Sequence, residues 1–210
     1  MQTTSIKLDG RLSACAELVR RCKTVADIGT DHGLLPCFLW QNGWSDIIAS
    51  DINQNPLNSA RETIERYGAG GVKPVLSNGF ENLPPRDDII IAGMGGETIL
   101  EILSGCKYKD ENTRFILQPM TRHEELRRGL YALGFEIIEE VFAVSGKKFY
   151  TVIYARFTGN KCEIDEIFAF FGKQKNPVYI KSQSEKIKKL AKGDRRYSAL
   201  AAKIWTLSGI

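Results

Sequence analysis

The sequence predicts a doubly wound α/β domain followed by a small helical tail, and three observations support this fold class. Short β-rich runs alternate with helical patterns along most of the chain. Glycine-containing turns follow the ends of several of these runs. The last two runs are separated only by a short turn. We therefore expect a seven-stranded sheet, mostly parallel, with helices on both faces and an antiparallel hairpin at one edge.

The elements are expected in a regular order. Residues 8–22 carry apolar side chains at helical spacing and predict an amphipathic helix. Five strands are then expected at 24–28, 46–50, 72–76, 88–92 and 114–118, alternating with helices at 34–41, 56–67, 97–103 and 122–133. Strands 135–144 and 148–157, joined at Ser145-Gly146, predict the edge hairpin.

A domain boundary is expected near residue 158, which divides the chain into an α/β domain at 1–158 and a helical tail at 159–210. Asn176-Pro177 should break the tail, because proline lacks a backbone donor and disfavours helix in the residue before it. A three-four spacing interrupted by Asp194 predicts a small helical hairpin, formed through Ile187, Leu190, Tyr197, Ala201 and Ile204.

Positive charge is concentrated in this tail. Residues 159–210 hold 11 Lys and Arg against 5 Asp and Glu, a net charge of +6, whereas the rest holds 18 against 20, or −2. Clustered basic side chains displace counterions from a phosphate backbone, which predicts a polyanion partner. A solvated helix face is the alternative. The basic candidates for contact with such a polyanion are Lys186, Lys188, Lys189, Arg195 and Arg196.

Cysteine usage and hydropathy indicate a cytoplasmic protein. The five cysteines are scattered and form no CxxC pair, so neither a disulfide framework nor a metal site is expected. The first residues lack the apolar stretch of a signal peptide, and apolar runs such as those at 89–92 and 167–171 are too short to cross a bilayer. No membrane association is expected.

The first predicted strand ends in the segment DIGTDHG, at 27–33, and leads directly into a helix. Ligands of open α/β sheets bind at the carboxyl ends of the strands. Gly29 permits a tight turn, and Gly33 permits close approach of backbone to ligand or of helix to strand. Asp27 can accept a hydrogen bond from a ligand amino group, and the helix amino terminus can face a ligand carboxylate.

A dinucleotide site is the rival interpretation of this loop. Its glycine spacing is GxxxG, however, and not the GxGxxG of dinucleotide-binding loops. Asp31 also places a carboxylate where a pyrophosphate would need backbone donors, while a sulfonium and an ammonium tolerate that charge. The loop therefore favours S-adenosylmethionine as the cofactor.

Two further turns fit the same ligand. Asp51 closes the second strand, where a carboxylate can accept hydrogen bonds from both ribose hydroxyls, although it could equally cap the helix before Pro56. Asn78, Gly79 and Phe80 follow the third strand, where a polar and an apolar side chain can hold an adenine ring. An ordinary Asn-Gly turn is the alternative there.

The fourth strand is followed by three glycines in four residues, at Gly93-Met94-Gly95-Gly96. Such a segment destabilises any regular element, and a simple helix entry needs at most one glycine. Close approach of a ligand to the backbone is the function that we predict for it.

Four segments resemble one family. ADIGTDHGLLP, ASDINQNPLNSA, AGMGGETI and ILQP are similar to the bacterial transfer RNA methyltransferases that modify nitrogen 1 of adenine 22 in the D-arm. The resemblance covers nearly the whole chain and implies the Rossmann-like class I fold of S-adenosylmethionine-dependent enzymes, with a coiled helical tail. It implies cofactor contacts at Asp27, Gly29, Asp31, His32, Gly33, Asp51, Gly79, Gly93, Met94 and Gly95. Thr30, Asn78 and Phe80, in the same turns, are further candidates for cofactor binding. Asn78 and Met120 depart from the family pattern, where aspartate and asparagine are typical.

Methylation at nitrogen 1 needs mainly alignment, because a neutral ring lone pair attacks a methyl group. Positive charge then develops on the adenine, and Asp31 is the candidate carboxylate to stabilise it, unless it only orders the loop. His32 is expected to contact the cofactor more than to cap a helix. The remaining substrate candidates are Arg11 for phosphate or carboxylate, Tyr150 for stacking on the base or for structure alone, and Gln118.

Other functions stay open at this point. Methyltransferases of exocyclic amino groups carry an Asn/Asp-Pro-Pro-aromatic motif after the fourth strand, whereas Pro84-Pro85 comes before it. A non-catalytic RNA-binding protein of the same fold is a second possibility. A methyltransferase of a small metabolite, with a dimerising tail, is a third. The oligomeric state is unknown from the sequence, with a monomer favoured over an oligomer.

Overall fold

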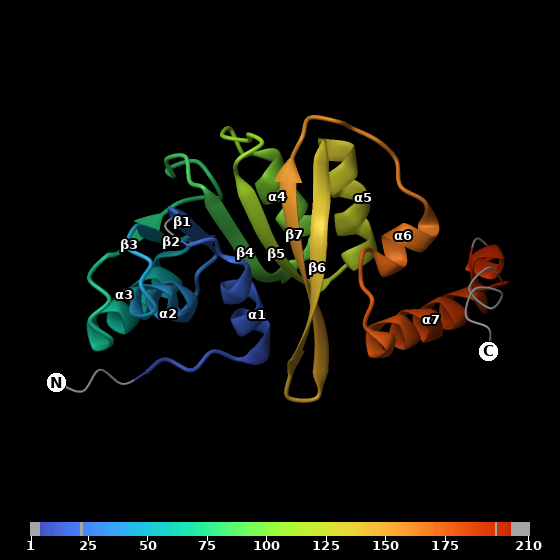
Figure 1. Ribbon diagram of the computed structural model, residues 1–210, viewed down its shortest axis with the longest axis horizontal. Coiled ribbons are helices and arrows are strands. Elements are labelled where there is room, and N and C mark those ends of the chain that lie inside the picture. Colours follow the sequence, from blue (N-terminus) through green and yellow to red (C-terminus); the bar gives the residue numbers. More distant parts are fainter. Residues whose placement is uncertain (1–4, 22, 196, 203–210) are drawn as a thin grey trace.

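The sheet has the predicted doubly wound architecture (Figure 1). The computed structural model describes residues 5–21, 23–195 and 197–202. Within them, seven strands lie in the order β3-β2-β1-β4-β5-β7-β6. Their bounds are β1 Val25–Ile28, β2 Ile47–Asp51, β3 Val72–Leu76, β4 Asp88–Gly95, β5 Arg114–Thr121, β6 Phe135–Ser145 and β7 Lys148–Phe157.

The first five strands are parallel, and β6 and β7 run antiparallel as the predicted edge hairpin. The first five helices cover the two faces of the sheet and bury two apolar cores against it. Helices α1 (Gly10–Leu18), α2 (Leu34–Gln41) and α3 (Gln54–Arg66) cover one face, and α4 (Gly96–Ser104) and α5 (His123–Leu133) cover the other.

Helix α1 is shorter than the predicted 8–22 and ends at Leu18. The backbone N–H of Arg20 donates to the Asp88 carboxylate at 2.7 Å, and its guanidinium donates to the same group at 2.7 Å. Asp88 begins β4 and is fully buried. These bonds draw the chain out of the helix, because they use a donor that a further helical turn would need.

Strands β4 and β5 are longer than predicted. The expected ends were 92 and 118, whereas β4 continues to Gly95 and β5 to Thr121. The extra pairing is irregular, with register shifts between Ala92 and Met94 and between Met94 and Gly95. Gly93 and Gly95 thus lie in a bulged strand end and not in a free loop. Glycine accommodates the bulge at Gly93, where φ is 82°.

The tail forms a short helix, α6 (Glu166–Phe171), and a longer one, α7 (Pro177–Ala191), followed by a helical turn at 197–202. The predicted break lies at Asn176, whose side chain caps α7. Most of the predicted apolar positions pack around Phe170 in one small cluster, whose members are Ile187, Leu190, Tyr197, Leu200 and Ala201. Ile204 lies outside the described residues.

A buried ion pair joins the tail to the α/β domain. Arg127 of α5 donates to both carboxylate oxygens of Glu140 on β6, at 2.8 and 2.7 Å, and neither side chain is exposed. The same guanidinium donates to the Ala169 and Phe170 carbonyls of α6 and to the Tyr179 hydroxyl of α7. The tail is therefore fixed against the sheet by a shared, fully hydrogen-bonded charge.

Cys15, Cys37, Cys106 and Cys162 are free thiols, and Cys22 lies outside the described residues. In the part of the chain that the structure describes, no helix is long and apolar enough to cross a membrane.

Candidate functional site

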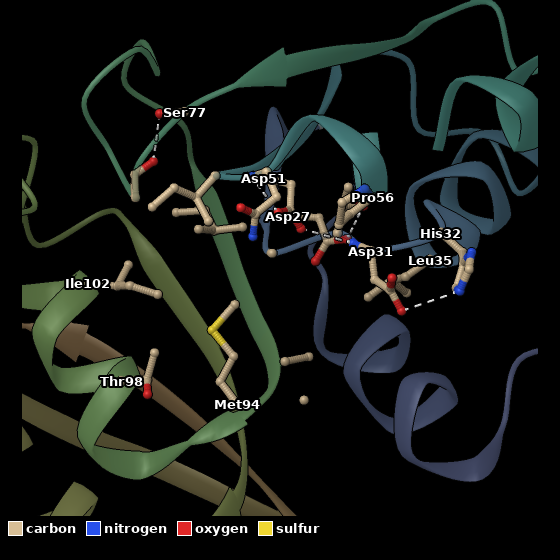
Figure 2. A pocket seen from close by; sticks show the side chains of 18 of the residues that line it. Asp27, Asp31, His32, Leu35, Asp51, Pro56, Ser77, Met94, Thr98 and Ile102 are labelled. Carbon is tan, nitrogen blue, oxygen red and sulfur yellow. Dashed lines mark hydrogen bonds and ion pairs between the residues drawn. The ribbon is translucent and has the colours of Figure 1, made fainter. Parts of the chain in front are cut away.

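A cleft opens where the strand order reverses. Strand β1 lies between β2 and β4, so the connections leaving β1 and β4 diverge to opposite faces of the sheet. This switch point is the expected place for a ligand in an open α/β sheet. The cleft has a volume of about 1060 Å³ and receives residues from α1 and from the ends of β1 to β4, with one wall formed by α4 (Figure 2).

Asp27 lies at the base of the cleft and is 4% exposed. The Thr30 hydroxyl donates to its carboxylate at 2.8 Å. Burial raises the pKa of the Asp27 carboxyl to about 6, and the neighbouring Asp51 also raises it. The charged form is thus destabilised in the absence of a ligand, because no salt bridge among the described residues compensates it.

Asp51 ends β2 beside Asp27, and Figure 2 shows both side chains converging on the cleft. Its carboxylate accepts hydrogen bonds from the backbone N–H of Asn53 at 2.9 Å and of Asp31 at 3.4 Å. Asp51 therefore orders both the β1 and β2 turns, but it does not cap α3, whose N-cap residue is Asn53. The carboxylate still lines the cleft, where it can accept from hydroxyl groups.

Asp31 and His32 lie at the rim. Asp31 has a φ of 51°, a conformation that aspartate tolerates better than most residues. Its side chain is 71% exposed and lies 3.6 Å from the His32 imidazole, which is 64% exposed. The cleft thus holds the two buried carboxylates of Asp27 and Asp51, while the carboxylate of Asp31 faces solvent at the entrance.

The turn after β3 forms another wall. Asn78 and Gly79 line the cleft with the buried Phe80, as the sequence predicts. Ser77 was missed, although it holds this turn together: its hydroxyl donates to the Gly79 carbonyl at 2.9 Å and accepts from the Asn82 N–H at 3.1 Å.

Gln118 of β5 lies behind the cleft and is fully buried. Its side-chain oxygen accepts from the Arg11 guanidinium at 2.9 Å and from the Gly93 N–H at 3.2 Å, while its amide donates to the Pro119 carbonyl. Arg11 lines the cleft and crosses above Gly93, where a side chain on residue 93 would meet the guanidinium at 3.2 Å. Gln118 therefore positions two cleft residues and does not itself line the cavity.

Several other predicted site residues lie outside the cleft lining. Gly33 packs against Ala60 of α3, and Gly95 precedes α4. Tyr150 packs in the core next to α1. The basic tail candidates lie on or after α7, on the far side of the hairpin from α1 in Figure 1, and Arg196 lies outside the described residues.

Helix α4 contributes a wall that sequence reasoning missed. Thr98, Glu101, Ile102 and Gly105 line the cleft at three-four spacing, which is one face of a helix. That periodicity was available as a signal. Ile52, which follows Asp51 and is 59% exposed, also lines the cleft and was missed.

The arrangement suits a cationic nucleoside. Two buried carboxylates offer acceptors and form no salt bridge among the residues that the structure describes, and Ile52 and Phe80 supply apolar surface for a flat ring. Within the described residues no group of three or more His, Cys, Asp or Glu side chains is placed to hold a metal ion.

Comparisons with known proteins define the class first. Residues 8–153 match the family described as a methyltransferase domain. A Streptococcus pneumoniae protein solved in complex with S-adenosyl-L-methionine superposes with a TM-score of 0.82 at 28% identity, covering 97% of this chain and 99% of that one. The fold is therefore the predicted class I, Rossmann-like fold of S-adenosylmethionine-dependent methyltransferases.

More specific relatives cover nearly the whole chain. The tRNA (adenine(22)-N(1))-methyltransferase of Bacillus subtilis (strain 168) is 32% identical over an alignment of 195 residues. The alignment covers 87% of this chain and 82% of that protein. M. capricolum TrmK, solved with S-adenosyl-homocysteine, is 30% identical with a TM-score of 0.77 and 94% coverage of both chains. The chain belongs to the family of bacterial tRNA (adenine(22)-N(1))-methyltransferases, as the sequence resemblance predicts.

Proposed function

We propose that the protein methylates nitrogen 1 of adenine 22 in transfer RNA, with S-adenosylmethionine as the methyl donor. The observation that carries this function is the pair of buried carboxylates, Asp27 and Asp51, at the switch point of a chain that belongs to this family. S-adenosylmethionine supplies a methyl group on a sulfonium, and transfer requires no metal ion.

Each wall of the cleft has a part in binding the cofactor. Asp27 accepts from the amino group, and Asp51 accepts from the ribose hydroxyls. Ile52, Asn78 and Phe80 hold the adenine ring between apolar and polar surfaces. The other contacts come from the turns themselves, at Gly29, Thr30, His32, Gly79, Gly93 and Met94, all of which line the cleft. Gly33 and Gly95 act by shaping the starts of α2 and α4.

Asp31 is the residue that we assign to the chemical step. Its exposed carboxylate lies at the entrance, where a base extruded from the RNA would arrive. Nitrogen 1 is on the Watson–Crick edge, so the adenine must be unpaired or flipped before it can react. Positive charge appears on the adenine as the new bond forms, and a nearby carboxylate stabilises it or accepts the amino proton.

The basic tail supplies affinity for the RNA backbone. Lys188, Lys189 and Arg195 are exposed, while Lys186 is engaged by Glu124 at 2.6 Å. We place the enzyme in the cytoplasm, where its RNA substrate is found. The metabolite alternative, in which the tail dimerises, is disfavoured because the tail packs its predicted apolar positions against α6 of the same chain.

The test is to incubate the protein with methyl-labelled S-adenosylmethionine and an unmodified transfer RNA transcript, then map the nucleoside by mass spectrometry. We expect 1-methyladenosine at position 22 and no product on a transcript with guanine at that position. A methyl group on an exocyclic nitrogen, or none on RNA, would contradict the proposal.

The tail's contribution is best tested by charge substitution. Deleting residues 159–210 would also remove the Ala169, Phe170 and Tyr179 groups that accept hydrogen bonds from Arg127. A truncated chain would therefore lose stability as well as basic charge.

A further inference from the structure

The edge hairpin extends well beyond the sheet. Strand β5 pairs with β7 only from Arg114–Arg156 to Leu117–Ile153. Beyond Ile153, β6 and β7 pair only with each other, as far as Ser145 and Lys148. The connecting turn is Gly146-Lys147, with Gly146 at a φ of 59°. Figure 1 shows this two-stranded ribbon projecting from the body of the molecule, between α1 and α7.

One face of the ribbon is covered along its length, whereas the other is covered by the tail near the base and exposed only toward the turn. Val141, Ala143, Tyr150 and Val152 pack into the core on the α1 side. Side chains alternate across a strand, so the intervening residues lie on the opposite face. That face carries Phe142, Val144 and Phe149. Val144 is 47% exposed and Phe149 is 51% exposed, although both are apolar.

The exposed face includes an aromatic pair. The rings of Phe142 and Phe149 stack with centroids 5.6 Å apart and an interplanar angle of 29°. Exposed apolar surface at the end of a supported ribbon marks an interaction site more often than a structural need. Aromatic faces beside positive charge are the surfaces on which proteins stack unpaired bases.

Positive charge borders this face. Lys147 and Lys148 are exposed at the turn, and no salt bridge among the described residues involves either of them. Their charges therefore remain available to a polyanion. A protein partner with an apolar surface would gain nothing from two unpaired lysines beside the aromatic pair.

The position of the ribbon links the cleft to the tail. A side chain on Gly10 would collide with the Val144 carbonyl, so α1 begins directly against the ribbon, and Arg11 next to it lines the cleft. On the other side, Glu140 at the base of the ribbon shares Arg127 with Tyr179 of α7. RNA that reaches from the cleft to the basic tail must pass the hairpin.

We propose that the distal part of the β6–β7 hairpin is a second RNA-binding surface, on which an unstacked base near the target adenine packs against Phe149 and Val144 while Lys147 and Lys148 contact phosphates. The proposal rests on the proposed function. It assigns the hairpin to recognition of the folded RNA, and the cleft to the cofactor and the reacting base.

The experiment compares two variants with two matched controls. The apolar variant is Val144→Ser with Phe149→Ser, and the charge variant is Lys147→Ala with Lys148→Ala. The controls are Tyr108→Ser, an exposed aromatic in the loop between α4 and β5, and Lys73→Ala on β3, both away from the hairpin. Transfer RNA affinity is measured over a range of salt, with S-adenosylmethionine affinity by calorimetry and thermal melting alongside.

The apolar variant should bind transfer RNA about tenfold more weakly with an unchanged salt slope. The charge variant should lose affinity and reduce the slope of log affinity against log salt by about 1 to 2. Both should bind S-adenosylmethionine as the wild type does, and the controls should match the wild type throughout.

Two outcomes would overturn the hairpin assignment while leaving the proposed function intact. One is unchanged transfer RNA affinity and methylation in both hairpin variants. The other is a wild-type dimer in sedimentation that dissociates in the apolar variant at unchanged RNA affinity, which would assign the face to self-association. If the wild-type protein neither binds nor methylates transfer RNA, the proposed function itself fails.

Discussion

Two buried carboxylates in this protein have opposite environments. Glu140, beneath the tail, receives two hydrogen bonds from Arg127, and burial alone would lower the pKa of that arginine, but its ion pair with Glu140 raises it. Asp27, in the cleft, accepts a hydrogen bond from the Thr30 hydroxyl and forms no salt bridge with any described residue, and burial raises its pKa to about 6. A carboxylate paired within the chain holds the fold together, whereas one left unpaired at a cleft is available to a ligand.

The largest expected effect comes from breaking the paired site. Arg127→Met should lower the free energy of unfolding by about 3–5 kcal/mol, because Glu140 is left buried without a partner. Urea unfolding followed by circular dichroism measures this. The double variant Arg127→Met with Glu140→Leu should recover most of the loss, and a double variant as unstable as the single one would show that the tail carbonyls matter more than the pair.

Loss of Asp51 should weaken S-adenosylmethionine binding and leave the Arg127–Glu140 ion pair beneath the tail intact. Asp51→Ala removes the acceptor for the ribose hydroxyls and should weaken S-adenosylmethionine binding by roughly 30- to 100-fold, equivalent to about 2–3 kcal/mol. Calorimetry gives the affinity. Asp46→Ala, at the amino end of β2, is the matched control and should leave it unchanged.

Asp27→Asn should change cofactor affinity and the stability of the fold in opposite directions. The substitution removes a desolvated charge, so the free energy of unfolding at pH 7 should rise by roughly 1–2 kcal/mol while cofactor affinity falls about tenfold. Thermal melting and calorimetry on one preparation give both values. A variant that loses stability would show that the Asp27 carboxylate is satisfied within the fold, as Glu140 is.

The pH dependence of cofactor binding follows from the same carboxyl group. Its pKa in the ligand-free protein, about 6, lies above the ordinary value of 3.8 for an aspartate carboxyl. Asp27 therefore destabilises the fold above pH 6, and this cost disappears as the pH falls toward 4. A cationic ligand needs the charged form, so affinity should fall about tenfold between pH 7 and pH 5. Asp27→Asn should flatten this profile, and an equally steep profile in the variant would assign the titration elsewhere.

The smallest effect is expected at the tail surface. Lys188→Ala with Lys189→Ala should weaken transfer RNA binding only a few-fold at moderate salt, because each exposed lysine contributes one screened phosphate contact. Filter binding at two salt concentrations measures it. Cofactor affinity and the melting temperature should stay at wild-type values, in contrast to the Arg127 variant a short distance away.

Local chemistry made much of the fold and of the cleft predictable. Strand ends, glycine turns and the acidic residues at the ends of β1 and β2 are properties of short segments. Parallel strands then place their carboxyl ends at one edge, so Asp27 and Asp51 had to converge. The longer β4 and the early end of α1 were not predicted, because each depends on a partner distant in the sequence, such as Asp88 for Arg20.

By itself, the sequence determined the α/β order, the switch-point site, the edge hairpin and the break in the tail, since periodicity and turn residues act over a few positions. Only the tertiary structure decided which polar groups are paired and which apolar groups are exposed. Gln118 became a buried support, Glu140 an anchor for the tail and Phe149 an exposed surface. Burial and pairing arise from contacts between distant segments, and they are settled only when those segments pack.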